Sequence, residues 1–373
     1  MQRPETGALL GTVAVFVIFA GFDATPDHLW LSQAGLAAWS QQAAFCGIMA
    51  VPVGLLMIGG EFDLSAGVTT GVTAMLMALL VGHLRWNAWL AILATLALAA
   101  LIGLSNGFVV ARSKLPGFIV TLATLLVLYG ASVGGALLAN GGSIQVSIVG
   151  TSFPGLASAR DVFGGTFASN SSLPSGYQTA VLWFIAVTVA CACVLGRTTF
   201  GHWIYAVGGA AAAARNAGVP VARTKILLFM STSLAAGLVG IISFTQALSA
   251  VSGQGAGYGL YYIVAAMAGG CLLTGGYGSA VGAALGACMI GMAFQGVIYA
   301  GWDSSRDFTF LGIVLFLAVL VNAVVYRRAQ QAGRIADGML AGRPGPVPAA
   351  APGPGDGSGD GGGSGSRTRP ASG

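Results

Sequence analysis

Two acidic side chains lie close together in the sequence GGEFDLSAG, residues 59–67, between two strongly apolar segments. If these segments cross a membrane, Glu61 and Asp63 are functional candidates, because an ionisable group at membrane depth is costly. We expect Asp63 and the neighbouring Ser65 either to line a pathway at a re-entrant break or to lie in a short turn. In the turn, the carboxylate of Asp63 would cap the helix that follows.

Two threonines form a second candidate for contact with a polar solute. The segment KLPGFIVTLATL, residues 114–125, begins with the helix breakers Pro116 and Gly117 and places Thr121 and Thr124 on one helix face. Their hydroxyls either face a solute pathway or hydrogen-bond back to carbonyls of their own helix. The sequence leaves both interpretations open.

Residue types for ATP chemistry, metal binding and acid–base catalysis are scarce. The phosphate-binding motif G-x-x-x-x-G-K-[ST] requires a lysine, and neither Lys114 nor Lys225 completes it. We therefore expect no cofactor on this chain, with any ATP bound by a partner subunit. The three histidines fall in expected loops, so the sequence predicts no metal site and no proton relay. The absence of a paired base and nucleophile disfavours an enzyme.

The composition identifies lipid as the solvent of this chain. Of its 373 residues, 55% are apolar and only 7% are charged, and the mean hydropathy is +0.82; soluble domains carry roughly 25% charged residues. We predict an all-α, polytopic membrane protein that binds no nucleic acid. The 59 glycines favour close helix–helix packing, and Gly278, Gly282 and Gly286 form one such stripe. The five cysteines lie in apolar segments and are expected to be buried.

Ten segments are apolar enough to be transmembrane helices, each of which needs about 20 residues. They are residues 7–22, 35–59, 64–82, 88–111, 117–138, 177–196, 226–249, 260–275, 278–300 and 308–326. The first segment also resembles a signal peptide, but no A-x-A cleavage site follows it, and we interpret it as an anchor. The joints at 60–63 and 276–277 are expected to be very short.

The distribution of Lys and Arg predicts which side of the membrane each loop faces. An even number of spans places both termini on one side, which the positive-inside rule identifies as the cytoplasm. With this orientation, 13 of the 16 Lys and Arg residues lie inside, and only Arg85, Arg160 and Arg306 lie outside. We therefore predict a transmembrane domain over residues 1–335 with both termini cytoplasmic.

Two further polar segments lie outside the expected transmembrane spans. Residues 140–173, on the outer side, are rich in Gly, Ser, Asn and Pro. We expect a flexible loop there, or a docking surface for a soluble partner. Residues 336–373 are mostly Gly, Pro, Ala, Ser and Asp, a composition that predicts a disordered cytoplasmic tail.

The longest polar-flanked interval of the second half, residues 201–225, reads GHWIYAVGGAAAAARNAGVPVARTK. Its five consecutive alanines favour a short helix over residues 210–217, which Gly218 would end in a left-handed conformation before Pro220. A capped helix on the cytoplasmic side is a surface for a partner. The residues predicted to form it are Gly208, Gly209, Ala213, Ala214, Arg215, Gly218 and Val219. Arg215, its one charged side chain, either contacts the partner or is an ordinary positive-inside arginine.

Four blocks of sequence, in order, resemble permease subunits of bacterial ATP-binding-cassette importers for ribose and other simple sugars. GGEFDLSAG resembles G-G-x-D-L-S-x-G, and residues 114–125 resemble L-P-x-F-I-x-T-L. Residues 198–225 resemble T-x-x-G-x-x-x-Y-A-x-G-G-N-x-x-A-A-x-x-x-G-I, and residues 265–287 resemble A-A-x-x-x-G-G-T-S-L-x-G-G-x-G-S-x-x-G-x-x-x-G-A. The chain departs from these patterns at Ala210, Gly259, Cys271 and Leu272, and by one extra residue, Glu61 or Phe62.

The resemblance implies a non-enzymatic subunit of the bacterial cytoplasmic membrane that imports a small polar solute, such as ribose or xylose. It implies three partners: a second permease subunit (the same or a related chain), a cytoplasmic ATPase and an extracytoplasmic solute-binding protein. Closure of the ATPase would push on residues 210–218. A permease for branched-chain amino acids or nucleosides, or a secondary transporter that works alone, remains an alternative.

Overall fold

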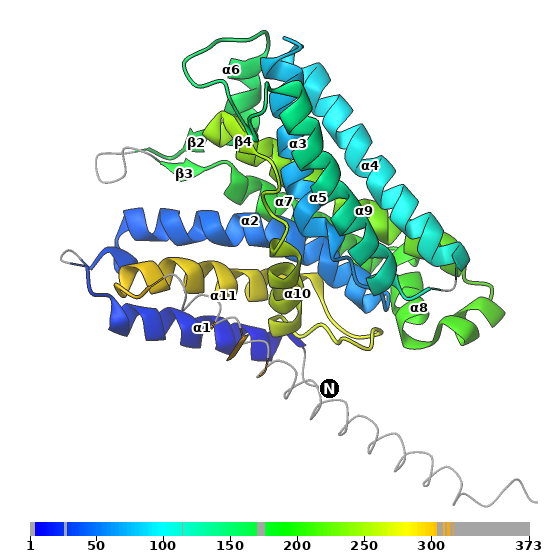
Figure 1. Ribbon diagram of the computed structural model, residues 1–373. Coiled ribbons are helices and arrows are strands. Elements are labelled where there is room, and N and C mark those ends of the chain that lie inside the picture. The colour runs from blue at the N-terminus through cyan, green and yellow to red at the C-terminus, as the bar shows by residue number, and fades with distance from the viewer. Residues whose placement is uncertain are drawn as a thin grey trace, which may run out of the picture. The chain divides into compact units, whose positions relative to one another are not determined.

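Helices form almost all of the regular structure (Figure 1). The computed structural model describes residues 4–25, 28–113, 115–169, 176–303, 309, 312–313 and 316. The helices are α1 (Pro4–Phe22), η1 (Leu29–Leu31), α2 (Gln33–Ile58), α3 (Ser65–Gly82), α4 (Ala88–Ser113), α5 (Gly117–Ala139), α6 (Leu156–Ala159), η2 (Arg160–Gly164), α7 (Ala180–Arg197), α8 (Thr199–Asn216), α9 (Val221–Ala247), α10 (Tyr258–Ala268) and α11 (Ala280–Tyr299). The strands are β1 (Gln145–Ser147), β2 (Thr166–Phe167), β3 (Tyr177–Gln178) and β4 (Ser249–Val251), in the antiparallel pairs β1–β4 and β2–β3. The all-α prediction is confirmed.

Eight of the described helices are long and apolar enough to cross a membrane, namely α1, α2, α3, α4, α5, α7, α9 and α11. Each coincides with a predicted span, which confirms a multi-pass membrane protein. The last predicted span, 308–326, lies almost entirely outside the described residues, and the predicted tail, 336–373, lies wholly outside them.

The predicted span at 260–275 is wrong in its form. Helix α10 has only 11 residues, and the chain before and after it, 252–257 and 269–279, is not helical. The predicted two-residue joint at 276–277 is therefore a segment of eleven residues. Glycines explain the break, because Gly253, Gly255, Gly270, Gly275 and Gly276 all adopt positive φ. Irregular backbone is tolerated at membrane depth where protein buries it.

Helix α2 lies at the centre of the packing. Every residue from Cys46 to Ile58 is buried, and the helix contacts α7, α9, α10 and α11. Figure 1 shows α1, α11 and α2 running side by side, and contacts join α11 to both neighbours. Close approach depends on glycine, since a Cβ on Gly291 of α11 would lie 2.3 Å from the backbone nitrogen of Ala43.

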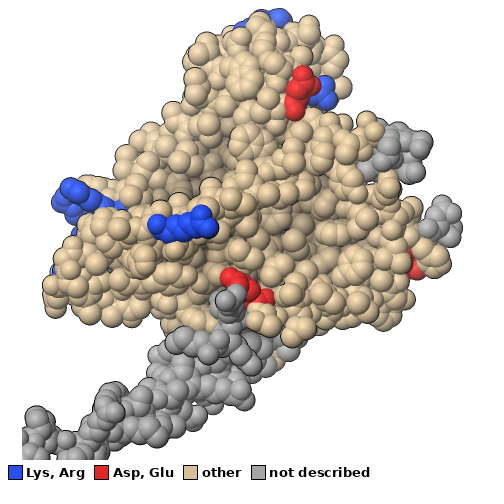
Figure 2. Space-filling model, turned by 180° about the vertical axis from the view of Figure 1, so that it is seen from behind, with Lys and Arg blue, Asp and Glu red and all other residues tan. Residues whose placement is uncertain are grey.

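The outer faces of several helices are apolar and exposed. Leu93 on α4 and Val127 on α5 are 64% and 69% exposed, and the face shown in Figure 2 has very few charged side chains. Such faces are suited to contact with the membrane, because the hydrocarbon tails of lipids solvate apolar side chains. Of the five cysteines expected to be buried, Cys46 and Cys271 are buried, Cys191 and Cys288 are half-buried, and Cys193 on α7 is exposed, so the prediction is wrong for Cys193.

The segment predicted to be an outer loop, 140–173, has regular structure over much of its described part, 140–169, which differs from the flexible loop that was expected. It contains β1, α6, η2 and β2. Arg160 Nε donates to the carbonyl of Thr245 at 3.2 Å, and the Phe163 ring stacks on Trp183 with centroids 5.2 Å apart. Trp183 Nε1 donates to the Val162 carbonyl at 3.0 Å. The segment thus packs on α9 and α7. The docking-surface interpretation remains a prediction.

Candidate functional site

Three Gly-Gly pairs meet at one point of the structure: Gly59–Gly60, Gly208–Gly209 and Gly275–Gly276. We call this contact the glycine junction. A Cβ on Gly208 would lie 1.7 Å from the Ile58 carbonyl oxygen and 2.7 Å from the Gly276 nitrogen. The Gly276 N–H donates to the Ile58 carbonyl at 2.8 Å. Gly60, Gly275 and Gly276 all have positive φ, so the junction depends on glycine for both space and backbone conformation.

The predicted short helix follows the glycine junction directly. Helix α8 is interrupted at Ala210, whose φ of −160° and ψ of 89° are extended, and it continues to Asn216. The predicted start at Ala210 is thus wrong by one residue, and the first half of α8, from Thr199, is a helix that the sequence analysis did not anticipate. We call residues 211–216 the short arm of α8.

The end of the short arm confirms the predicted left-handed cap. Gly218 has a φ of +84°. Its N–H donates to the Arg215 carbonyl, and the Val219 N–H donates to the Ala214 carbonyl, both at 3.0 Å. These two bonds define a Schellman motif. Ala213 and Arg215 are exposed, and contact of Arg215 with a partner remains a prediction.

The four residues predicted to line a pathway, Asp63, Ser65, Thr121 and Thr124, are brought together in one buried hydrogen-bond network. The Asp63 carboxylate accepts from the Ser65 backbone N–H at 2.9 Å and from its hydroxyl at 2.6 Å. Asn106 of α4 joins the network: its Nδ2 donates to Ser65 Oγ at 2.9 Å, and its Oδ1 accepts from Thr124 Oγ1 at 2.7 Å.

The network ties α9 and α5 to the joint between α2 and α3. The Thr232 hydroxyl of α9 donates to Asp63 Oδ2 at 3.0 Å, and Thr121 of α5 accepts from the Leu64 N–H at 3.2 Å. Thr121 also donates back to the carbonyl of Gly117 at 3.0 Å, as one of its two interpretations predicted. Asp63 is fully buried. Its carboxylate accepts from the N–H of Ser65, the first residue of α3, although the residue at the N-cap position of α3 is Leu64.

The second acidic residue of the joint makes an ion pair. Lys225 Nζ, near the start of α9, contacts Glu61 Oε1, and the two side chains are 21% and 12% exposed. It is the one ion pair in which both side chains belong to described residues. No group of three or more His, Cys, Asp or Glu among the described residues is placed to hold a metal.

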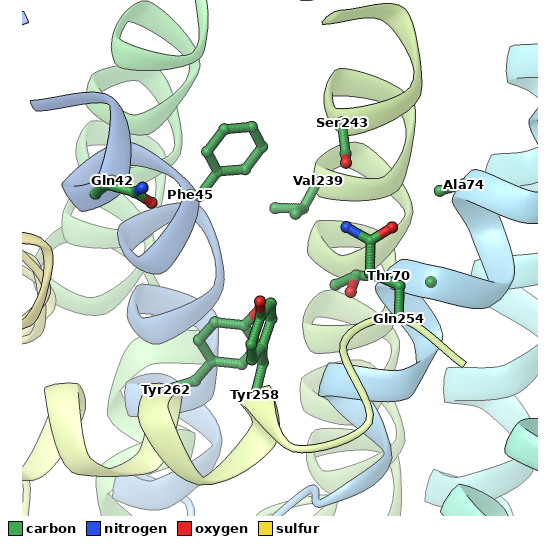
Figure 3. A pocket seen from close by; sticks show the side chains of 10 residues that line it. Gln42, Phe45, Thr70, Ala74, Val239, Ser243, Gln254, Tyr258 and Tyr262 are labelled. Carbon is green, nitrogen blue, oxygen red and sulfur yellow. The ribbon is translucent and has the colours of Figure 1, made fainter. Parts of the chain in front are cut away.

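A cavity of about 180 Å³ lies between α2, α3, α9, α10 and the non-helical turn before α10 (Figure 3). The residues that line it are Gln42, Phe45, Thr70, Gly71, Ala74, Val239, Ser243, Gln254, Tyr258 and Tyr262. Six of these ten residues have a hydroxyl or an amide in the side chain, and none carries a charge. Three of them, Phe45, Tyr258 and Tyr262, have an aromatic ring. A cavity of this size holds several water molecules, which suits one small solute.

The broken span creates this cavity. A Cβ on Gly255 would lie only 2.4 Å from the Gly67 carbonyl oxygen. The turn 252–257 therefore packs directly on the first turn of α3. Gln254, Tyr258 and Tyr262 therefore face α2 and α9 across the cavity, as Figure 3 shows. Irregular backbone in a membrane protein is found where it lines such a cavity.

This site was not predicted, because residues 250–259 fall between the expected spans 226–249 and 260–275 and carry no recognised motif. None of the four predicted pathway residues lines the cavity. The usable signals were Gln42 and Ser243 within apolar spans, and the four-residue spacing of Tyr258 and Tyr262, which places both rings on one helix face.

The predicted glycine stripe of α11 packs inside the chain. A Cβ on Gly282 would lie 2.2 Å from the Gly269 carbonyl oxygen, and one on Gly286 would lie 1.9 Å from that of Ala265. Gly278 has a φ of +147° and lies against Cys271. The stripe thus holds α11 against α10 and the segment that follows it.

A helical multi-pass fold with a polar cavity beside a broken span is typical of membrane transport proteins. A family model described as "Branched-chain amino acid transport system / permease component" matches residues 35–321. Because this match covers most of the chain, the protein belongs to that family of permease components.

Three relatives illustrate the similarity. The chain is 34% identical to the ribose import permease protein RbsC of Escherichia coli K12 over 282 residues, which cover 76% of this chain and 83% of the relative. It is 32% identical to the probable ABC transporter permease protein y4mJ of Sinorhizobium fredii, covering 84% and 88%. It is 29% identical to the xylose transport system permease protein XylH of Escherichia coli K12, covering 85% and 91%. No solved structure matches the chain significantly.

Proposed function

We propose that this chain is the membrane-spanning subunit of an ATP-binding-cassette importer that carries a monosaccharide across the bacterial cytoplasmic membrane. Two of the relatives described above are named for ribose and xylose. The observation that carries the proposal is the lining of the cavity, with hydroxyl, amide and aromatic side chains and no charge. Hydroxyls and amides pair with sugar hydroxyls, and aromatic rings cover apolar sugar faces.

The same lining disfavours branched-chain amino acids. A free amino acid carries an ammonium and a carboxylate, and removing these charges from water is costly unless protein charges or directed hydrogen bonds replace the lost hydration. Among the described residues that line the cavity, none is acidic or basic. A neutral solute therefore fits this cavity better than a zwitterion.

The energy for transport is proposed to come from a separate cytoplasmic ATPase that contacts the short arm of α8. Residues Ala212, Ala213 and Arg215 of this arm are exposed, and a capped helix is stiff enough to transmit a push. We propose that a second permease subunit, either the same or a related chain, completes the membrane part. An extracytoplasmic binding protein is proposed to deliver the solute.

Uptake of labelled D-ribose into membrane vesicles tests the proposal. The assembled importer should take up D-ribose only with ATP inside and binding protein outside, and excess D-xylose should compete more strongly than L-leucine or adenosine. Uptake by the purified chain under an ion gradient, with no ATPase present, would instead show a secondary transporter. Stronger competition by L-leucine would show an amino acid permease.

The variant Gln254→Leu tests the cavity itself. It replaces the amide by an apolar group of similar size. We expect the concentration of D-ribose for half-maximal uptake to rise about tenfold, because losing one hydrogen bond to a bound solute costs ~1–1.5 kcal/mol. Gln33→Leu, at an exposed position at the start of α2, is the matched control and should leave uptake unchanged. Equal effects of both variants would refute a solute site at Gln254.

A further inference from the structure

We propose that the Glu61–Lys225 ion pair is a positioning element that transmits movement of the short arm of α8 to the walls of the cavity. This inference rests on the proposed function, because it assigns a route between the ATPase contact and the solute. The pair joins two elements that are far apart in sequence, the joint 59–64 and the start of α9.

The start of α9 is packed against the short arm. Ala214 of the arm and Val221 of α9 are buried in one cluster with Val207 of the first half of α8, and Ala211 and Val219 pack on its edge. Only the Schellman turn and Pro220 separate the arm from α9. Displacement of the arm therefore displaces the first turns of α9, where Lys225 lies.

Helix α9 holds the joint at two points on one face. Lys225 contacts Glu61, and Thr232, seven residues and two helical turns later, donates to Asp63 at 3.0 Å. Residues spaced by seven lie on the same face of a helix. Two attachments prevent the joint from rotating about either one, so the joint must follow α9.

The joint continues directly into both helices that form one side of the cavity. Helix α3 begins at Ser65 and contributes Thr70 and Ala74 to the lining, and α2 ends at Ile58 and contributes Gln42 and Phe45. At the glycine junction, a Cβ on Gly60 would lie 3.4 Å from the Cα of Gly208. The joint is thus in contact with the arm side and continuous with the cavity side.

The ion pair is suited to this role because it is mostly shielded from water. The side chains of Glu61 and Lys225 are only 12% and 21% exposed, so their attraction is stronger than that of a pair on an open surface. Arg223, two residues before Lys225, is exposed and makes no ion pair with a described residue. Both cations lie on the first turns of α9, but only Lys225 reaches the joint.

The test measures how many D-ribose molecules the assembled importer transports per ATP hydrolysed, together with the amount of ATPase that copurifies. Glu61→Gln and Lys225→Gln should each lower this ratio about tenfold, within the usual range of coupling between sites, while ATPase copurification stays normal. The charge swap Glu61→Lys with Lys225→Glu should restore most of the ratio. Arg223→Gln is the matched control and should leave it unchanged.

Three outcomes would overturn the proposal: an unchanged ratio in both single variants, a charge swap as poor as the single variants, or an equal loss in Arg223→Gln. If Glu61→Gln does not accumulate in the membrane, Glu61→Asp replaces it, because it keeps the charge but shortens the side chain. Glu61→Asp is then expected to lower the number of D-ribose molecules transported per ATP by less than tenfold. An unchanged number would refute the proposal. Failure of the unmodified importer to transport D-ribose would refute the proposed function instead.

Discussion

Uptake is expected to be lost in the variant Ala214→Pro, while insertion of the chain into the membrane stays normal. Position 214 lies beyond the first turn of the short arm, which starts after the extended residue Ala210. Proline there removes an intrahelical hydrogen bond and clashes with the preceding turn, at a cost of ~3 kcal/mol. We expect D-ribose uptake to fall roughly a hundredfold, measured in vesicles with matched amounts of inserted protein.

The matched control is Ala211→Pro. Residue 211 is the first helical position of the short arm, where the N–H has no intrahelical partner and proline is tolerated. The extended conformation of Ala210 is also one that a residue before proline readily adopts. Near-normal uptake is expected in Ala211→Pro. If both variants transport normally, the short arm has no coupling role.

The second large effect is expected for Gly208→Ala, which disrupts the glycine junction. The new Cβ would lie 1.7 Å from the Ile58 carbonyl oxygen and 2.7 Å from the Gly276 nitrogen. Both contacts are backbone atoms and cannot rotate away, so the segments must separate, at a cost of about 1–3 kcal/mol or more. We expect little correctly folded protein in size-exclusion chromatography of detergent extracts, and no uptake.

The neighbouring glycine gives an internal comparison for this variant. A Cβ on Gly209 meets no atom within 4 Å, and its φ is not in the left-handed region. Gly209→Ala should therefore give a normal elution profile and normal uptake. A normal profile for Gly208→Ala as well would show that the three segments are not held together as closely as the structure indicates.

The sequence was sufficient to predict the class of fold, because long apolar segments in a chain with few charges have no alternative to membrane helices. It was misleading at residues 260–275. Hydropathy averages over the whole window, whereas the glycines at 270, 275 and 276 bend the chain locally. The regular structure of residues 140–169 was also missed, since it depends on contacts such as the packing of Phe163 on Trp183 of α7, which no local sequence pattern encodes.

The candidate site shows what local motifs reveal and what they hide. The cap at Gly218 was predictable, because a run of alanines followed by glycine and proline encodes it locally. Asp63, Ser65, Thr121 and Thr124 were selected as candidate pathway residues, and the structure places them in a largely buried hydrogen-bond network. Their role in a pathway remains a prediction. The partner of Glu61 is Lys225, on a helix far along the chain, and no pattern in one sequence identifies such a contact.

The broken span has a consequence for how solute preference can change. Gln254, Tyr258 and Tyr262 all lie in the short stretch that includes the turn 252–257 and the start of α10. The long helices α2 and α9 supply most of the scaffold and make many other contacts. One continuous stretch therefore supplies three of the ten lining residues, so changes confined to it alter the cavity lining while the long helices keep their sequence.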